Sequence, residues 1–143
     1  MKINWNGFLK EAIENYPNES CAFLFTNKPY SPDEEWTVFS VKNVSKTPKE
    51  EWIPDRNEMI EVKRKATKLG LIKIGNIHTH PYAEEFDIGE QKLPSPKDLF
   101  FARRFNDIVR GILVIGKGMI LACHLHDKFG REIPVFLDGK DEK

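Results

Sequence analysis

Two histidines two positions apart carry the clearest chemical signal in the sequence. His78 and His80 stand in the segment Gly75-Asn76-Ile77-His78-Thr79-His80-Pro81, which we expect to form a β-strand. Residues two apart on a strand point to the same face, so the two imidazoles project side by side. Such a pair can bind one metal ion at about 2.0–2.1 Å each and leave room for a carboxylate and a water. Pro81 is expected to end the strand, which places both rings at the edge of the sheet.

A carboxylate for that metal stands in the later segment Ser95-Pro96-Lys97-Asp98. A serine at a helix cap with an acid three residues on is, by itself, a capping box worth about 1 kcal/mol to the helix and nothing to catalysis. If this helix abuts the end of the histidine strand, however, Asp98 completes a His-His-Asp ligand set. The Ser95 hydroxyl would then lie beside the metal as a hydrogen-bond donor.

A water activated by a metal also needs a proton acceptor. Glu19 directly precedes an apolar run over residues 21–26 that is typical of a buried strand. Its ordinary interpretation is a solvated acid in a turn. The alternative is a carboxylate at the mouth of a strand, hanging over a site that a neighbouring strand builds.

The same histidine spacing recurs in His124-Leu125-His126, which shows that the spacing alone is a weak signal. Only Asp127 and the charged tail follow as further ligands. We therefore expect His124 and His126 to be two outward-facing polar residues of an alternating strand, without a metal.

Taken together, the first set of residues resembles the JAMM metalloprotease family, also called the MPN-plus or JAB domain. The family pattern is a glutamate near the first strand, then His-Ser/Thr-His-Pro, then Ser-x-x-Asp. The chain matches it in that order with Glu19, with His78-Thr79-His80-Pro81 and with Ser95-Pro96-Lys97-Asp98. The segment Pro17-Asn18-Glu19-Ser20-Cys21 is also similar to the Pro-x-Glu-x-Cys segment of the family. Because so many positions of fixed type and order seldom occur together by chance, the combined motif is highly specific.

The resemblance implies one catalytic zinc ion, bound by His78, His80 and Asp98 with water as the fourth ligand. Glu19 would take a proton from that water and hand it to the leaving amine, and Ser95 would help to hold the oxyanion. The implied activity is a zinc-dependent isopeptidase or peptidase that removes ubiquitin-like modifier proteins from conjugates or trims their C-termini. Small ubiquitin-like modifiers and sulfur-carrier proteins are the implied substrates, and free-standing prokaryotic members are the most similar.

Two departures from the family pattern concern the surroundings of the site. Ala22 stands where the family often has glycine after the cysteine, and the gap between Pro81 and Ser95 is longer than usual. The acidic loop 82–94 is then either a solvated surface loop or a flap that closes over substrate or shields the zinc.

Two other classes of function compete with the hydrolase. One is a metal-free MPN-type scaffold that serves as an interaction module, although scaffold members usually lack the ligands present here. The other is a DNA-repair-associated JAB relative, which the balance of 22 Lys+Arg against 22 Asp+Glu does not favour. The signatures of zinc deaminases and of His-Glu-x-x-His proteases are absent from the sequence.

Periodicity predicts the elements that must position these residues. Apolar steps of three and four predict a helix from Trp5 to Tyr16 that Pro17 ends. A second helix is expected from a capping box at Asp55 to Gly70, with Met59, Val62, Ala66 and Leu69 buried. A third is expected from Ser95 to about residue 105. Strands are expected over residues 21–26, 35–43, 71–79, 108–115, 119–126 and 132–137.

This order of elements predicts an α/β fold with a single mixed β-sheet flanked by helices. The resemblance implies the MPN/JAB-domain, cytidine-deaminase-like version of it. One domain over residues 1–137 and a disordered tail over residues 138–143 are expected. Cys21 and Cys123 are expected to be two buried thiols, with a disulfide between them as the alternative. No apolar run suits a membrane span or signal peptide, so we expect a cytoplasmic protein that binds neither membrane nor nucleic acid.

Overall fold

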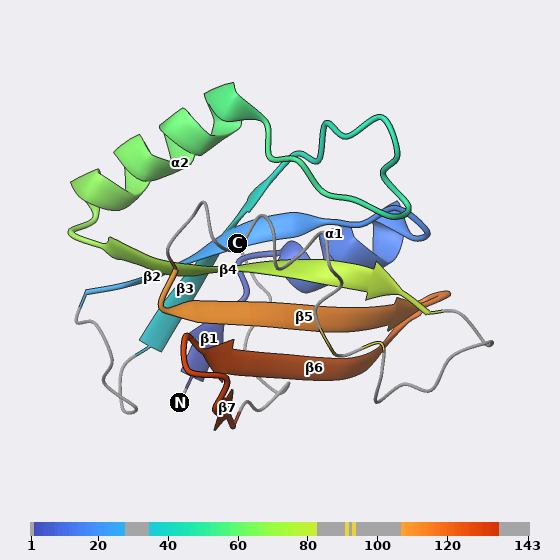
Figure 1. The fold of residues 1–143 in the computed structure, drawn as a ribbon. Coiled ribbons are helices and arrows are strands. Elements are labelled where there is room, and N and C mark those ends of the chain that lie inside the picture. Colours follow the sequence, from blue (N-terminus) through green and yellow to red (C-terminus); the bar gives the residue numbers. More distant parts are fainter. Residues whose placement is uncertain (1, 28–34, 83–90, 92, 94–106, 135–143) are drawn as a thin grey trace.

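The computed structural model describes residues 2–27, 35–82, 91, 93 and 107–134 (Figure 1). In chain order the elements are β1 (Lys2–Asn4), α1 (Phe8–Asn15), β2 (Cys21–Thr26), β3 (Glu35–Val41), α2 (Arg56–Lys68), β4 (Ile72–Pro81), β5 (Val109–Gly116), β6 (Met119–Asp127) and β7 (Glu132–Ile133). The predicted third helix from Ser95 and most of the loop 82–94 lie outside the described residues. In the part of the chain that is described, no helix is long and apolar enough to cross a membrane.

The strands form one mixed sheet in the order β1-β3-β2-β4-β5-β6-β7. Two of the contacts, β1 with β3 and β4 with β5, are parallel, and the others are antiparallel. The strands lie side by side in Figure 1. The predicted single mixed sheet is therefore confirmed.

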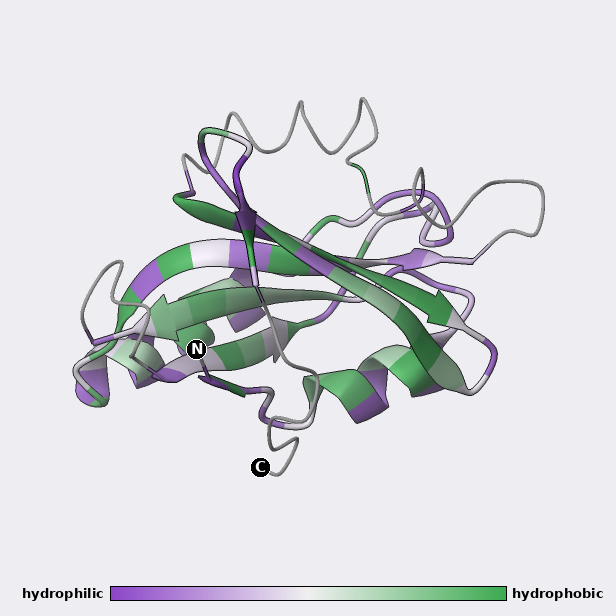
Figure 2. Cartoon of the chain, turned by 90° about the horizontal axis from the view of Figure 1, so that it is seen from below, coloured by the Kyte–Doolittle hydropathy of each residue, from purple (hydrophilic) through white to green (hydrophobic). Residues whose placement is uncertain are grey.

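The two helices cover opposite faces of this sheet. Successive residues of a strand point to opposite faces, and alternate residues of β2 pack into two different cores. Ala22 and Leu24 of β2 belong to the core beneath α1. Their neighbours Cys21, Phe23 and Phe25 belong to a second core with Ala66 of α2. In Figure 2 the hydrophobic colour runs along much of the strands, as expected for a sheet buried on both faces.

Helix α1 begins three residues later than predicted. Trp5 is fully buried as the apolar pattern requires. However, Asn6 and Gly7 have φ values of 53° and 83°, a left-handed conformation that cannot continue a right-handed helix. Phe8, with Leu9 and Ala12, therefore starts the buried face.

Helix α2 has the predicted cap, and the carboxylate of Asp55 accepts hydrogen bonds from the backbone N–H groups of Asn57 and Glu58. Glu58 does not complete a capping box, because its carboxylate accepts from the backbone N–H of Lys42 instead. At the other end, Gly70 has a φ of 72° and its N–H donates to the carbonyl of Thr67. The predicted stop at Gly70 is thus confirmed as a left-handed glycine cap.

The predicted burial of Leu69 is wrong, since this side chain is 61% exposed. The backbone N–H of Leu71 donates to the carbonyl of Ala66, and Leu71 packs against the core that contains Ala66. The glycine cap reverses the chain, so Leu71 takes the inward position that helical periodicity assigned to Leu69.

The strands agree with the predictions to within about two residues, with two exceptions. Strand β1 was not predicted, and β7 comprises only Glu132–Ile133, beyond which residues 135–137 are not described.

The two cysteines are free thiols on opposite faces of the sheet, so the disulfide alternative is wrong. Burial raises the pKa of Cys123 to about 12. Burial, reinforced by nearby carboxylates, raises the pKa of Cys21 still further.

Candidate metal centre

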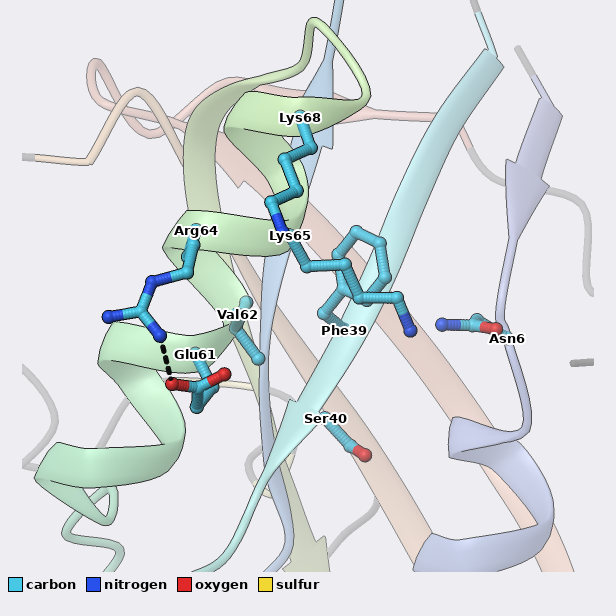
Figure 3. A pocket seen from close by; sticks show the side chains of 8 residues that line it. All are labelled: Asn6, Phe39, Ser40, Glu61, Val62, Arg64, Lys65 and Lys68. Carbon is cyan, nitrogen blue, oxygen red and sulfur yellow. Dashed lines mark hydrogen bonds and ion pairs between the residues drawn. The ribbon is translucent and has the colours of Figure 1, made fainter.

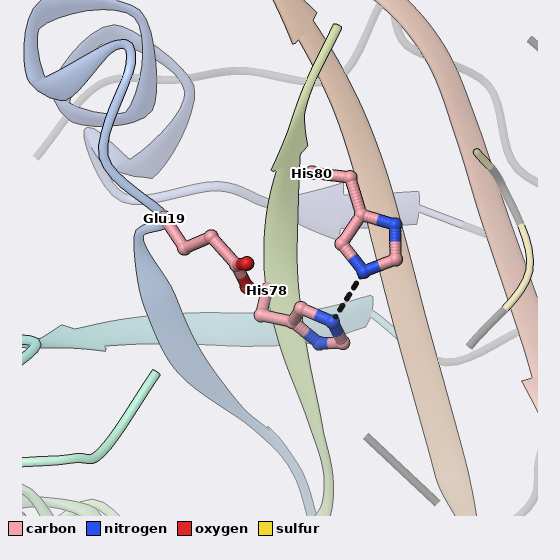
Figure 4. A group of neighbouring side chains, drawn as sticks. All are labelled: Glu19, His78 and His80. Carbon is pink, nitrogen blue, oxygen red and sulfur yellow. Dashed lines mark hydrogen bonds between the residues drawn. The ribbon is translucent and has the colours of Figure 1, made fainter. Parts of the chain in front are cut away.

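Three side chains that could ligate a metal converge at one end of β4. Their ligand atoms, a carboxylate oxygen of Glu19 and a ring nitrogen each of His78 and His80, all lie within 4.8 Å of one another. Figure 4 shows the Glu19 carboxylate turned toward the two rings. In the part of the chain that the structure describes, no other His, Cys, Asp and Glu residues form such a group.

Pairing between β2 and β4 brings the glutamate to the histidines. Cys21 is the register partner of His78, so Glu19, two residues before Cys21, lies at the same end of the sheet. Ser20 and Thr79 extend this pairing. The Ser20 N–H donates to the Thr79 hydroxyl at 2.8 Å, and the Thr79 N–H donates to the Ser20 carbonyl at 2.9 Å.

The two imidazoles face each other through their Nε2 atoms, which are 3.1 Å apart. Two nitrogens bound to one tetrahedral zinc at about 2.05 Å would be about 3.3 Å apart.

The Nδ1 atom of His80 lies 2.6 Å from the carbonyl oxygen of Gln91. Because a carbonyl only accepts hydrogen bonds, Nδ1 carries the proton and the Nε2 lone pair faces His78. This is the tautomer that a metal-binding histidine needs, with its outer nitrogen held by a carbonyl. The donor set thus fits a zinc-like cation.

Trp52 fixes the orientation of the His78 ring. The two rings stack with centroids 5.4 Å apart and an interplanar angle of 21°. Trp52 is almost fully buried in the core beneath α2. Trp52 was not predicted as part of the site, because only the folded chain brings residue 52 against residue 78.

Asn43 holds the backbone around Glu19 and was also missed. Its side-chain N–H groups donate to the carbonyls of Glu19 and Glu51, both at 2.9 Å. Its side-chain oxygen accepts from the N–H groups of Ser45 at 3.0 Å and Ile53 at 2.9 Å. The sequence signal that could have pointed to Asn43 is the Asn-x-Ser turn, in which an asparagine accepts from the N–H two residues on.

Glu19 is 5% exposed, so the interpretation as a solvated turn acid is wrong. A cavity of about 380 Å³ adjoins it, with Glu11, Glu58 and Asn43 also in the lining. His78 is equally buried, whereas His80 is half-buried. A carboxylate and two imidazoles are thus held together in a poorly solvated place, where electrostatic interactions are strong.

Ser95 and Asp98 lie outside the described residues, and their roles stay predictions. The structure brings together Glu19, His78 and His80 from the predicted site.

The second histidine pair lies on the opposite face of β6 from the buried Leu125, as the alternation of a strand predicts. His124 and His126 stack on each other with centroids 5.4 Å apart and are half-buried. His124 lies 3.2 Å from a carboxylate oxygen of Glu132. Burial lowers the pKa of His126, and the neighbouring His124 and Arg110 lower it further.

The sequence matches a family described as prokaryotic homologs of the JAB domain over residues 4–123. A comparison with curated proteins finds no match.

Three of the solved structures that are similar to this chain illustrate the shared fold. A protein from Desulfitobacterium hafniense is 22% identical with a TM-score of 0.62, and the match covers 96% of this chain and 92% of that one. A protein from Salinibacter ruber is 20% identical with a TM-score of 0.56, and coverage is 98% and 91%. A JAB1/MPN domain protein from Archaeoglobus fulgidus is 18% identical with a TM-score of 0.52, and coverage is 94% of both chains.

Proposed function

The chain belongs to the family of prokaryotic JAB-domain homologs, and on that premise we propose that it is a zinc-dependent isopeptidase or peptidase. Its proposed substrates are ubiquitin-like modifier or sulfur-carrier proteins, which it removes from conjugates or trims at the C-terminus. The observation that carries the proposal is the convergence of Glu19, His78 and His80 within 4.8 Å.

The residues have distinct roles in this proposal. His78 and His80 hold the zinc ion, with Asp98 as the third protein ligand. Zinc, when bound, polarises the scissile carbonyl and lowers the pKa of water from 15.7 to about 7. Glu19 accepts a proton from the attacking water on its carboxylate and passes it to the leaving amine. The Ser95 hydroxyl donates to the oxyanion that develops on the carbonyl.

The substrate tail proposed for this site is an extended C-terminus that ends in glycine. Such a segment can add as a strand beside a sheet, and glycines pass through a narrow approach to a buried site. Glu19 and His78 are both buried, so small glycine residues suit the approach to them better than bulky ones do.

Incubation with conjugates of several ubiquitin-like proteins, read by mass spectrometry, tests the proposal. We expect cleavage after the terminal glycine of at least one modifier, its loss with a zinc chelator, and its return with added zinc. Zinc binding without cleavage of any conjugate would contradict the peptidase proposal. A chain that binds no zinc would instead be a scaffold module.

Two substitutions test the residues that the structure does not describe. We expect Asp98→Ala to abolish both zinc binding and cleavage. We expect Ser95→Ala to lower the rate by about 10²–10³ with zinc content unchanged. If Ser95→Ala lowers only the melting temperature, Ser95 is a helix cap and no more.

A further inference from the structure

Strand β3 has an open outer edge over half of its length. On the side away from β2, β1 pairs only with Glu35, Trp36 and Thr37. Residues 38–41 have no strand neighbour on that side within the described part of the chain. The cause is the left-handed turn at Asn6 and Gly7, which deflects the chain away from β3 and into α1. The edge therefore offers backbone groups that a further strand can bond.

A groove lies along this open edge between α2 and the turn at Asn6 (Figure 3). Its volume is about 550 Å³. Phe39 and Ser40 of β3 contribute to its lining, together with Val62 of α2. The groove combines an unpaired strand edge with apolar side chains, which is the arrangement that takes up an extended peptide.

The wall that α2 contributes is positively charged. Glu61 is neutralised by Arg64, with 2.6 Å between its carboxylate and the guanidinium. Lys65 extends over the ring of Phe39, with its ammonium 5.5 Å from the ring centroid. Among the residues that the structure describes, no carboxylate forms an ion pair with Lys65 or Lys68. Within the described residues, two ammonium groups thus stand beside the groove without an ion-pair partner.

We propose that this groove binds an extended acidic segment of a partner protein, which adds to β3 as a strand beside residues 38–41. Backbone hydrogen bonds to the strand edge hold the segment. Apolar side chains on its face toward α2 pack against Val62, beside the almost fully buried Phe39, and carboxylates on the same face meet Lys65 and Lys68. The site is independent of the proposed peptidase function, because β3 is separated from the histidine strand by β2 and the binding uses none of the candidate metal ligands.

Fluorescence anisotropy of the full chain with the short labelled peptide Thr-Val-Thr-Glu-Thr-Val-Thr-Glu tests the charge requirement, because valine and glutamate then alternate on one face of the added strand, the face toward α2. We expect saturable binding, weakened about tenfold by Lys68→Glu. Lys63→Glu is the matched control, since it makes the same charge change on the same helix outside the groove lining. It is expected to change binding little. Equal weakening by both substitutions, or equal binding of the same peptide with lysine in place of each glutamate, would overturn the proposal.

The backbone requirement has its own test. The same peptide with every backbone nitrogen methylated has no N–H donor on either edge and cannot form a strand ladder, so we expect its binding to be lost. Undiminished binding of the methylated peptide would overturn strand addition. Preferred binding of duplex DNA in the same assay would identify a nucleic-acid surface and also overturn the proposal. The proposal would also be overturned if the chain bound no peptide but formed a dimer, and if Lys68→Glu abolished that dimer. Both tests work without zinc, so their outcome is distinct from the outcome of the cleavage assay.

Discussion

The side-chain amide of Asn43 donates a 2.9 Å hydrogen bond to the backbone carbonyl of Glu19. The same side chain accepts a hydrogen bond from the backbone N–H of Ile53. The preceding residue, Trp52, stacks on the ring of His78. One asparagine thus connects the backbone of the candidate proton acceptor to the segment that orients a candidate metal ligand.

We expect Asn43→Ala to destabilise the chain and to lower turnover. The substitution removes four hydrogen bonds and leaves partly buried backbone groups without their partner, at a cost of about 1–3 kcal/mol for each buried group left unsatisfied. Urea unfolding and the kinetics of the cleaved conjugate measure the two effects. Asn43→Asp keeps the acceptor and loses the donors, so it should retain the turn at Ser45 but not the hold on Glu19. If kcat falls no further in Asn43→Asp than in a surface variant of equal stability, Asn43 has no positioning role.

Glu19→Gln is expected to keep the fold and zinc binding but to lower turnover by about 10²–10⁴, because an amide cannot accept and return the proton. The substitution is nearly isosteric, which suits a residue that is 5% exposed. Zinc content by elemental analysis and cleavage by mass spectrometry provide the two readouts. A loss of zinc with Glu19→Gln would make Glu19 a metal ligand rather than the proton acceptor.

The site was predictable from sequence where its residues are neighbours on the chain. The alternation of a strand is enough to put His78 and His80 on one face, and the structure has their Nε2 atoms 3.1 Å apart. Asn43 and Trp52 reach the site only through tertiary contacts. The Asn-x-Ser pattern indicates a turn at Asn43 but not its contact with Glu19, and no local pattern distinguishes Trp52.

The fold shows the same division between local and non-local causes. The stop of α2 at Gly70 follows from glycine's tolerance of the left-handed conformation, which is a local property. Strand β1 has only three residues, too few for their alternation to predict a strand, and it is a strand because it pairs with β3. The exposure of Leu69 follows from the cap geometry, which overrides the helical period.

We expect His78→Ala and His80→Ala each to lower zinc affinity strongly, because each removes a ring nitrogen from the convergent group. His124→Ala and His126→Ala are the matched controls, since they remove histidines of the same spacing from a nearby strand. Titration with zinc, followed by elemental analysis after dialysis, measures the effect. Unchanged zinc content in His78→Ala and His80→Ala, or an equal loss in the two controls, would remove the basis of the proposed metal centre.

Asp127 makes stability depend on pH at the turn between β6 and β7. Burial acts to raise the pKa of its carboxyl. Hydrogen bonds from the backbone N–H groups of Arg131 and Phe129 and from the Arg131 guanidinium outweigh burial and hold the pKa below its ordinary value of 3.8. A lowered pKa means that the ionised form stabilises the fold above the ordinary pKa and that this contribution is lost as pH falls through the native pKa.

We therefore expect Asp127→Asn to be less stable than the natural chain near neutral pH. The difference in the free energy of unfolding should shrink as pH falls below about 4. Urea unfolding of both chains across that range measures it, and a difference that stays constant with pH would show that the carboxylate charge contributes nothing to the turn.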